Sequence, residues 1–318
     1  MIALDQSSRY ELELSPLYRL GRTKDLAALL RWRGNPSQLK AFSKRDDHFD
    51  EYDQVDPKTL KKRHIEAPKA GLKRLQRRLN ALLQRIHAPP YLHSGIRGRS
   101  YLTHAGTHTQ AEGATLTADI SDYYPSVSTE RLQQLFRKDF RCSIDVAWIL
   151  ARLLSCRGHL ATGSPASAIV AFMANRSIFD ELAKRATKRG IAFSLYMDDL
   201  AFTGRGVNRS DAAAAGELLI RHGLRIKAKK TRLFHADQPK LVTGVAWRNG
   251  IKRAPNAQHK LMREALLVLQ RAPREPGHYR TAIGRVQHIA MLDDVRGPQL
   301  RKKARELRVG LKALESPR

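Results

Sequence analysis

Three aspartates have the residue type and the surroundings to act together in catalysis or metal binding. Asp119 ends the apolar, strand-like run TLTADI, and Asp198 and Asp199 are adjacent in SLYMDDLAFTG, between strand-forming residues. Adjacent carboxylates repel each other, and burying either one costs several kcal/mol unless a partner compensates its charge. If the two elements are neighbours in one sheet, Asp119 and one or both of the other two aspartates converge at one edge. Three carboxylates in one place cannot all be ionised without counter-charge.

Divalent cations supply that counter-charge. Hard ions such as Mg²⁺ prefer oxygen ligands and keep coordination sites for substrate phosphates. Two such ions, roughly 3.5 to 4 Å apart, activate an attacking hydroxyl and stabilise a leaving oxygen in phosphoryl transfer. The alternative is that Asp198 and Asp199 form an ordinary turn, where aspartate is common. Together with Asp119, the pair favours a site for two Mg²⁺ ions.

The net charge indicates the partner of such a site. The chain of 318 residues has 58 Lys and Arg against 30 Asp and Glu, a formal charge of +28. This excess predicts a polyanionic partner, nucleic acid before membrane, although a basic but inert surface is an alternative. No run of 18 apolar residues and no secretory signal is present, and there are only two cysteines. We therefore expect a cytoplasmic protein with no membrane association, disulfide scaffold or cysteine-rich zinc site.

The elements that must position the acids alternate between strands and helices. Periodicity and capping residues predict helices over residues 15 to 33, 69 to 87, 128 to 138, 144 to 155, 167 to 188, from Ser210 to His222, and through most of the last 60 residues. Strands are predicted over residues 52 to 55, 63 to 67, 116 to 120 and 192 to 203, and near 224 to 227, 231 to 235 and 241 to 247. This arrangement predicts an α+β protein whose parts pack as one unit.

Five segments resemble, in order, the motifs of reverse transcriptases. Tyr196-Met197-Asp198-Asp199 looks like the Tyr-x-Asp-Asp signature, and ADISDYYPSV (118 to 127) resembles the first palm motif. GHLATGSPAS (158 to 167) resembles the motif before the long palm helix, and LRIKAKKTRLF (224 to 234) resembles the next, with its Lys-Thr pair. Upstream, KTLKKRHIEAP (58 to 68) resembles the fingers segment. The resemblance covers roughly residues 25 to 295.

The resemblance implies a right-hand polymerase fold, which is α+β with fingers, a palm of antiparallel sheet plus helices, and a small helical thumb. The expected parts are an N-terminal helical region (1–48), fingers (49–114), a palm with fingers elements (115–235), and the palm end with a basic helical thumb (236–318).

The resemblance also implies roles in catalysis. The implied metal ligands are Asp119, Asp198, the Ile120 carbonyl and, as a nearby or weaker ligand, Asp199. Lys230 would protonate the pyrophosphate leaving group, with Lys227 and Lys229 as alternatives. Asp293-Asp294, a second acidic pair, lies outside the motifs and is expected to form a helix-end turn.

Two cations are candidates for holding the incoming dNTP. Lys58 and Arg63 could bind the triphosphate, because cationic groups stabilise charge in phosphoryl transfer. Arg63 fits the family pattern better. Lys61 or Lys62 could replace Lys58, which could equally be a solvated cation.

Further nucleotide contacts are expected near the first two motifs. By resemblance, Tyr124 is at the steric-gate position, where its ring would press on the sugar 2′ position, and Tyr123 belongs to the core. Gly163 and Ser164, followed by Pro165, form a turn that could approach the nucleotide, because small residues are needed where backbone meets ligand. A plain helix-entry loop is the alternative.

Within reverse transcriptases, two further features resemble the bacterial retron type. Val242-Thr243-Gly244 matches a retron hallmark, for which a tight turn that needs glycine is the simplest explanation. HSGIRGRSYLTHAGTH (93 to 108) lies where retron enzymes have Gly-Arg-Ser followed by Asn-Ala-x-x-His, with His104 in place of the asparagine. His104 and His108 have helical i, i+4 spacing, but no third ligand indicates zinc. By resemblance both segments bind RNA, and a local hydrogen-bonded turn is the alternative for the histidines.

The resulting hypothesis is an RNA-directed DNA polymerase of the retron type. It would copy part of a cognate structured noncoding RNA into single-stranded DNA, starting from a 2′-OH of that RNA, in an antiphage system with an effector protein. The alternatives are another bacterial defence reverse transcriptase, protein-primed or template-independent, and a non-catalytic RNA-binding protein on the same fold. The retention of three costly acids argues against the last.

Overall fold

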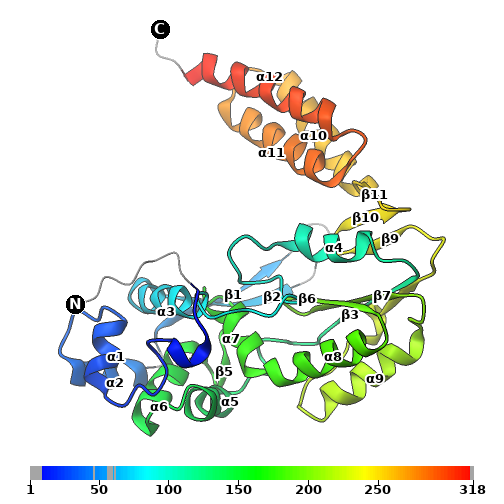
Figure 1. Ribbon diagram of the computed structural model, residues 1–318. Coiled ribbons are helices and arrows are strands. Elements are labelled where there is room, and N and C mark those ends of the chain that lie inside the picture. Colours follow the sequence, from blue (N-terminus) through cyan, green and yellow to red (C-terminus); the bar gives the residue numbers. More distant parts are fainter. Residues whose placement is uncertain (1–8, 46, 56–59, 61, 316–318) are drawn as a thin grey trace.

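A four-stranded antiparallel sheet lies at the centre of the molecule (Figure 1). The computed structural model describes residues 9–45, 47–55, 60 and 62–315. The strand order is β6-β7-β3-β8, and the strands are β3 (Ala114–Asp119), β6 (Ala192–Tyr196), β7 (Asp199–Gly204) and β8 (Arg232–Phe234). Helices α8 (Arg176–Lys188) and α9 (Arg209–Ile220) cover one face, and α4 (Tyr101–Thr109) lies over the other.

The N-terminal half packs helices and two hairpins against one end of this sheet. The hairpins are β1 (Phe49–Val55) with β2 (Lys62–Pro68), and β4 (Ser155–Cys156) with β5 (His159–Leu160). The helices are α1 (Thr23–Leu29), α2 (Pro36–Lys44), α3 (Ala70–Leu83), α5 (Thr129–Gln134), α6 (Ile144–Leu154) and α7 (Ser167–Ala174). One continuous hydrophobic core joins these helices to the sheet, so the two regions fold as one body.

The C-terminal part is a small sheet followed by a helical bundle that projects from the body (Figure 1). The sheet has the order β11-β10-β9, with β9 (Lys240–Val242), β10 (Val245–Arg248) and β11 (Ile251–Arg253). The bundle contains α10 (Asn256–Arg271), α11 (Pro276–Leu292) and α12 (Gly297–Glu315). A second core cluster, which includes Val245, Trp247 and Leu292, joins the bundle to this sheet.

The α+β class is confirmed, but five element predictions are wrong. The predicted helix over residues 15 to 33 is only the short helix α1, and a 3₁₀ turn (Leu12–Leu14) precedes the segment. Arg19 adopts φ +55, which a continuous α-helix does not allow. The predicted helix 167 to 188 is two helices, broken at Asn175. Asn208, not Ser210, caps α9. The predicted strand near 224 to 227 is reduced to one bridge at Ile226, and 241 to 247 is a hairpin.

Within the described residues, no helix is long and apolar enough to span a bilayer.

Candidate active site

Strand register brings the three aspartates together. Asp119, the last residue of β3, is directly opposite Asp199, the first residue of β7. Tyr196 pairs with Asp199 across the β6–β7 hairpin, so Met197 and Asp198 form its two-residue turn. Met197 has φ +54, the left-handed region that costs a non-glycine residue roughly 1 kcal/mol. The predicted convergence at one sheet edge is confirmed, with local backbone strain at the turn.

Backbone hydrogen bonds hold this edge in place. The Ile120 amide donates to the Asp198 carbonyl at 2.8 Å. The Lys227 amide donates to the Asp119 carbonyl, also at 2.8 Å. The segment that carries Lys227 and Lys230 is therefore tied to the strand that carries Asp119. The role of the Ile120 carbonyl as a metal ligand stays a prediction.

Two lysines compensate the charge of Asp119. The Lys230 ammonium donates to Asp119 Oδ2 at 2.6 Å, and Lys227 Nζ lies 2.8 Å from Oδ1. The second contact is an ion pair whose alignment is too poor for a hydrogen bond, which leaves the buried Oδ1 without one. The Asp119 side chain is only 8% exposed, so it needs this counter-charge.

Among the residues that the structure describes, Asp198 and Asp199 have no ion-pair partner, and burial disfavours their charged forms. Burial raises the pKa of Asp199 to about 7, with further contributions from Asp198 and Asp119, although the two lysines act against the shift. The pKa of Asp198 is also raised, first by burial and then by Asp119. Two adjacent acids with raised pKa values beside a third, buried carboxylate are typical of a functional site.

These residues fit hard divalent cations. The set offers carboxylate oxygens, one of them buried without a hydrogen bond, and the pKa values show a shortage of positive charge. A divalent cation would relieve that shortage, and carboxylates are the ligands it prefers. Glu51, Glu66 and Cys156 form another group that could hold an ion, between the β1–β2 and β4–β5 hairpins.

Tyr124 faces the aspartates. Burial raises its pKa to about 12, with smaller contributions from Asp198 and Tyr196, and the residue is partly exposed. Tyr123, by contrast, is buried and packs against Phe179, so its assignment to the core is confirmed. The role of Tyr124 as a steric gate for the nucleotide sugar stays a prediction.

A cavity of about 550 Å³ joins the aspartates to the Val242-Thr243-Gly244 turn. Its lining includes Asp119, Asp199, Lys230, Thr243 and Gly244. Thr243 and Gly244 have φ +45 and +80, and the flanking residues pair as β9 and β10. Two central residues with positive φ define a type I′ hairpin turn, so the predicted tight turn is confirmed. Arg232 lines the same cavity and was not predicted from the sequence. The one sequence feature that could have indicated it is its place in the basic run KAKKTR.

His104 and His108 are buried on α4. His104 Nδ1 lies 3.3 Å from Thr243 Oγ1, and its ring stacks on Tyr196. His108 Nε2 forms a hydrogen bond with Ser194 Oγ at 2.6 Å, and its Nδ1 forms one with Thr203 Oγ1. Burial lowers the pKa of both histidines to about 3, so they are neutral. The alternative of a local hydrogen-bonded turn is wrong, because both residues lie in helix α4 and their hydrogen bonds reach other elements. RNA binding by this segment stays a prediction.

Gly163 and Ser164 pack against the β1–β2 hairpin. A Cβ at Gly163 would lie 2.5 Å from the Glu66 carbonyl oxygen, so glycine is required by a neighbouring strand. Ser164 accepts a hydrogen bond from the Ala166 amide, as in a helix-entry loop. Nucleotide contact by either residue stays a prediction.

Arg63, one of the two predicted triphosphate-binding cations, does not lie at the aspartates. Arg63 is exposed on β2, opposite Gln54, and is not part of the cavity lining. Lys58 and Lys61 lie outside the described residues. Asp293 accepts hydrogen bonds from the Val295 and Arg296 amides, which confirms the predicted helix-end turn.

Three carboxylates at the end of an antiparallel sheet, with lysines and a cavity beside them, define a nucleotidyl-transfer site. The family described as reverse transcriptase (RNA-dependent DNA polymerase) matches residues 54–294. The chain therefore belongs to the reverse transcriptase family, and the site is that of an RNA-directed DNA polymerase. Enzymes of this family use divalent metal ions.

The curated relatives belong to retrons. The chain is 25% identical over 261 residues to the retron Se72 reverse transcriptase of Salmonella heidelberg, which covers 77% of this chain and 68% of the relative. It is 28% identical over 203 residues to the retron Mx65 reverse transcriptase of Myxococcus xanthus, covering 58% and 47%. For the retron Mx162 reverse transcriptase of the same organism the identity is 26% over 227 residues, covering 62% and 47%. The chain thus spans about half the length of the two Myxococcus enzymes. The expected resemblance to the retron type is confirmed.

Proposed function

We propose that this protein copies part of a cognate structured noncoding RNA into single-stranded DNA, starting from a 2′-OH of that RNA. The observation that supports this most directly is the cavity shared by the catalytic aspartates and the Val242-Thr243-Gly244 turn. The similarity of the chain to retron reverse transcriptases supports the same function. We further propose that the protein acts in antiphage defence with an effector protein and is cytoplasmic.

The proposed regions follow the right-hand polymerase plan. The fingers comprise residues 49–114, the palm 115–235, and the palm end with the thumb 236–318, after an N-terminal helical region over 1–48. The β1–β2 hairpin, the four-stranded sheet and the projecting helical bundle support this division. Helix α12 has the basic run RKKARELR, which suits a thumb that grips the phosphates of a duplex.

In the proposed site, Asp119, Asp198 and Asp199 hold two Mg²⁺ ions, with the Ile120 carbonyl as a further ligand. When bound, these ions would supply the Lewis acidity that activates a primer hydroxyl and stabilises the leaving pyrophosphate.

The remaining roles belong to side chains around the aspartates. The Lys230 ammonium leaves Asp119 and donates a proton to the pyrophosphate oxygen. Tyr124 excludes a ribose 2′-OH. Arg63, Lys58 and the loop at Gly163 and Ser164 contact the dNTP. The segment around His104 and His108 and the Val242-Thr243-Gly244 turn contact the RNA.

The test is the nucleic acid that copurifies with the protein from cells carrying its native locus. We expect a discrete RNA joined to single-stranded DNA, which is absent from the variant with Asp198→Ala and Asp199→Ala. Asp294→Asn, in the other adjacent acidic pair, is the matched control and should retain the DNA. RNA without DNA in every sample would refute polymerisation. DNA attached to the protein itself would refute RNA priming in favour of protein priming.

A further inference from the structure

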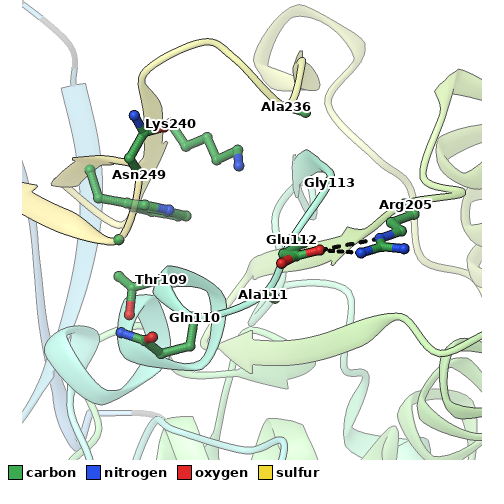
Figure 2. Close-up of a pocket in the computed structure, with 11 residues that line it drawn as sticks. Thr109, Gln110, Ala111, Glu112, Gly113, Arg205, Ala236, Lys240 and Asn249 are labelled. Atoms are coloured by element: carbon green, nitrogen blue, oxygen red, sulfur yellow. Dashed lines mark hydrogen bonds and ion pairs between the residues drawn. The ribbon is translucent and has the colours of Figure 1, made fainter.

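A second cavity lies at the other end of β3, away from the aspartates. Its volume is about 530 Å³, within the range of small-molecule sites of roughly 300 to 1,000 Å³. The end of α4 and the following loop form one wall, and the β9–β10–β11 sheet forms another (Figure 2). The six residues of β3 separate this cavity from Asp119 by about 17 to 20 Å, at roughly 3.3 Å per residue. It is therefore distinct from the catalytic site.

Lys240 is the unusual residue of this cavity. Among the residues that the structure describes, it is the one lysine that is buried, with 7% of its surface exposed. No carboxylate in the described part of the chain forms an ion pair with it, and burial lowers its pKa. An unpaired ammonium in a buried position destabilises the fold unless it acquires a partner. The cavity that Lys240 lines is where such a partner could bind.

The surroundings of Lys240 favour an anion. Trp247, which is 2% exposed, is the cross-strand neighbour of Lys240. The two side chains therefore share one face of the hairpin. On the opposite side of the cavity, Arg205 Nε donates to Glu112 Oε2 at 3.2 Å, which neutralises both groups (Figure 2). Lys240 is consequently the uncompensated charge of the cavity.

Two glycines contribute main chain to the lining of the cavity. Gly113 has φ +104, and Gly250 has φ +75 in the Asn249-Gly250 turn between β10 and β11. A Cβ at Gly113 would clash with the Gly204 carbonyl, whereas a Cβ at Gly250 would lie 3.8 Å from the Thr109 carbonyl oxygen, so a ligand can approach the main chain closely at Gly250.

We propose that this cavity binds a phosphate-bearing nucleotide. Its phosphate would bind Lys240, and its sugar or base would lie between Trp247 and the loops that contain Gly113 and Gly250. The formal charge of +28 favours nucleic acid as a partner, and phosphate is the anion that nucleic acid presents. The nucleotide is either free or part of an RNA strand, and the chemistry at Lys240 is the same for both. The inference rests on the nucleic-acid role of the chain and not on polymerisation.

The test measures binding of two probes, AMP and a fluorescent single-stranded RNA of roughly ten nucleotides, with EDTA present. Lys240→Met is expected to weaken AMP binding about tenfold or more, because it removes a charged hydrogen bond. Its Tm should be unchanged or higher, because the substitution removes a buried charge. Ala236→Phe, at the exposed rim of the cavity, should obstruct the same probe without altering Lys240. Lys184→Gln, an exposed lysine on α8, is the matched control.

The results distinguish the two sources of the nucleotide. Weakened binding of both probes would assign a free-nucleotide pocket. If Lys240→Met weakens binding of the RNA alone, and the slope of log binding constant against log salt concentration is smaller by about 0.7, the nucleotide is part of a strand. The proposal is overturned if Lys240→Met and Ala236→Phe bind both probes as the unaltered protein does. Asp198→Ala should bind AMP in this cavity normally, so failure of DNA synthesis and failure of this proposal are separate results.

Discussion

Replacing Asp199 with asparagine should stabilise the metal-free protein, and by an amount that depends on pH. A pKa of about 7 in place of the ordinary 3.8 corresponds to about 4 kcal/mol at 1.36 kcal/mol per pKa unit. Because Asp199 is partly exposed, solvent screening reduces this to roughly 1 to 2 kcal/mol. At roughly 2 °C per kcal/mol for a chain of this size, the expected gain in Tm is about 2 to 4 °C.

The raised pKa fixes the direction of the pH dependence. Below pH 3.8 the Asp199 carboxyl is protonated in both the folded and the unfolded protein, so it does not favour either state. Between about pH 4 and 7 the unfolded protein loses this proton first, so the free energy of unfolding falls as the pH rises. Above pH 7 the penalty is constant. The Tm difference between Asp199→Asn and the unaltered protein should therefore be near zero at pH 4 and largest at pH 8.

Thermal unfolding followed by circular dichroism in EDTA measures this difference. Asp237→Asn, an exposed aspartate between β8 and β9, is the control and should change the Tm little at any pH. Added Mg²⁺ should raise the Tm of the unaltered protein more than that of Asp199→Asn, because the variant lacks one ligand. A variant whose Tm at pH 8 equals or falls below that of the unaltered protein would refute the assignment of a burial penalty to Asp199.

Three further substitutions test the surroundings of the aspartates. Lys230→Met should lower kcat by about 10²-fold and change the alkaline limb of the pH–rate profile, as loss of a general acid would; an unchanged profile would exclude that role. Tyr124→Ala should reduce discrimination between dGTP and GTP by roughly 10- to 100-fold in single-nucleotide incorporation, whereas equal selectivity would contradict the gate. Gly163→Ala should destabilise the protein by about 1 to 3 kcal/mol through its clash with the Glu66 carbonyl, measured by urea unfolding. Gly106→Ala, with open space at its Cβ, is its control and should be neutral or stabilising.

The catalytic edge was predictable because it depends on local signals. Asp119 and Asp199 stand at the ends of apolar strands, and Asp198 lies in the two-residue turn of the β6–β7 hairpin. The β3–β7 register that makes Asp119 and Asp199 partners joins strands that are distant in the sequence. The helix breaks were not predictable in the same way. Asn175 interrupts an apolar run without glycine or proline, and its side chain donates to the Ala171 carbonyl, a local alternative that propensity does not reveal.

Apolar periodicity indicates burial more reliably than it indicates a helix. Leu17, Leu26 and Leu30 are all buried as the pattern over residues 15 to 33 requires, yet only part of that segment is helical. Lys240 shows the opposite limit of sequence reasoning. Nothing in PKLVTG marks its lysine as buried, because the burial comes from packing of distant elements around the β9–β10 hairpin.

His104 connects the two segments that resemble retron motifs to the hairpin that carries Asp198. Its ring stacks on Tyr196, two residues before Asp198, while its Nδ1 meets the hydroxyl of Thr243. The turn that carries Thr243 therefore reaches the catalytic hairpin through a single buried side chain. A rigid contact of this kind transmits a displacement at one end to the other, because close-packed interiors do not deform freely. The segments that resemble retron hallmarks thus lie against the catalytic turn itself, where RNA bound at the exposed Gly244 would act on the geometry of the site.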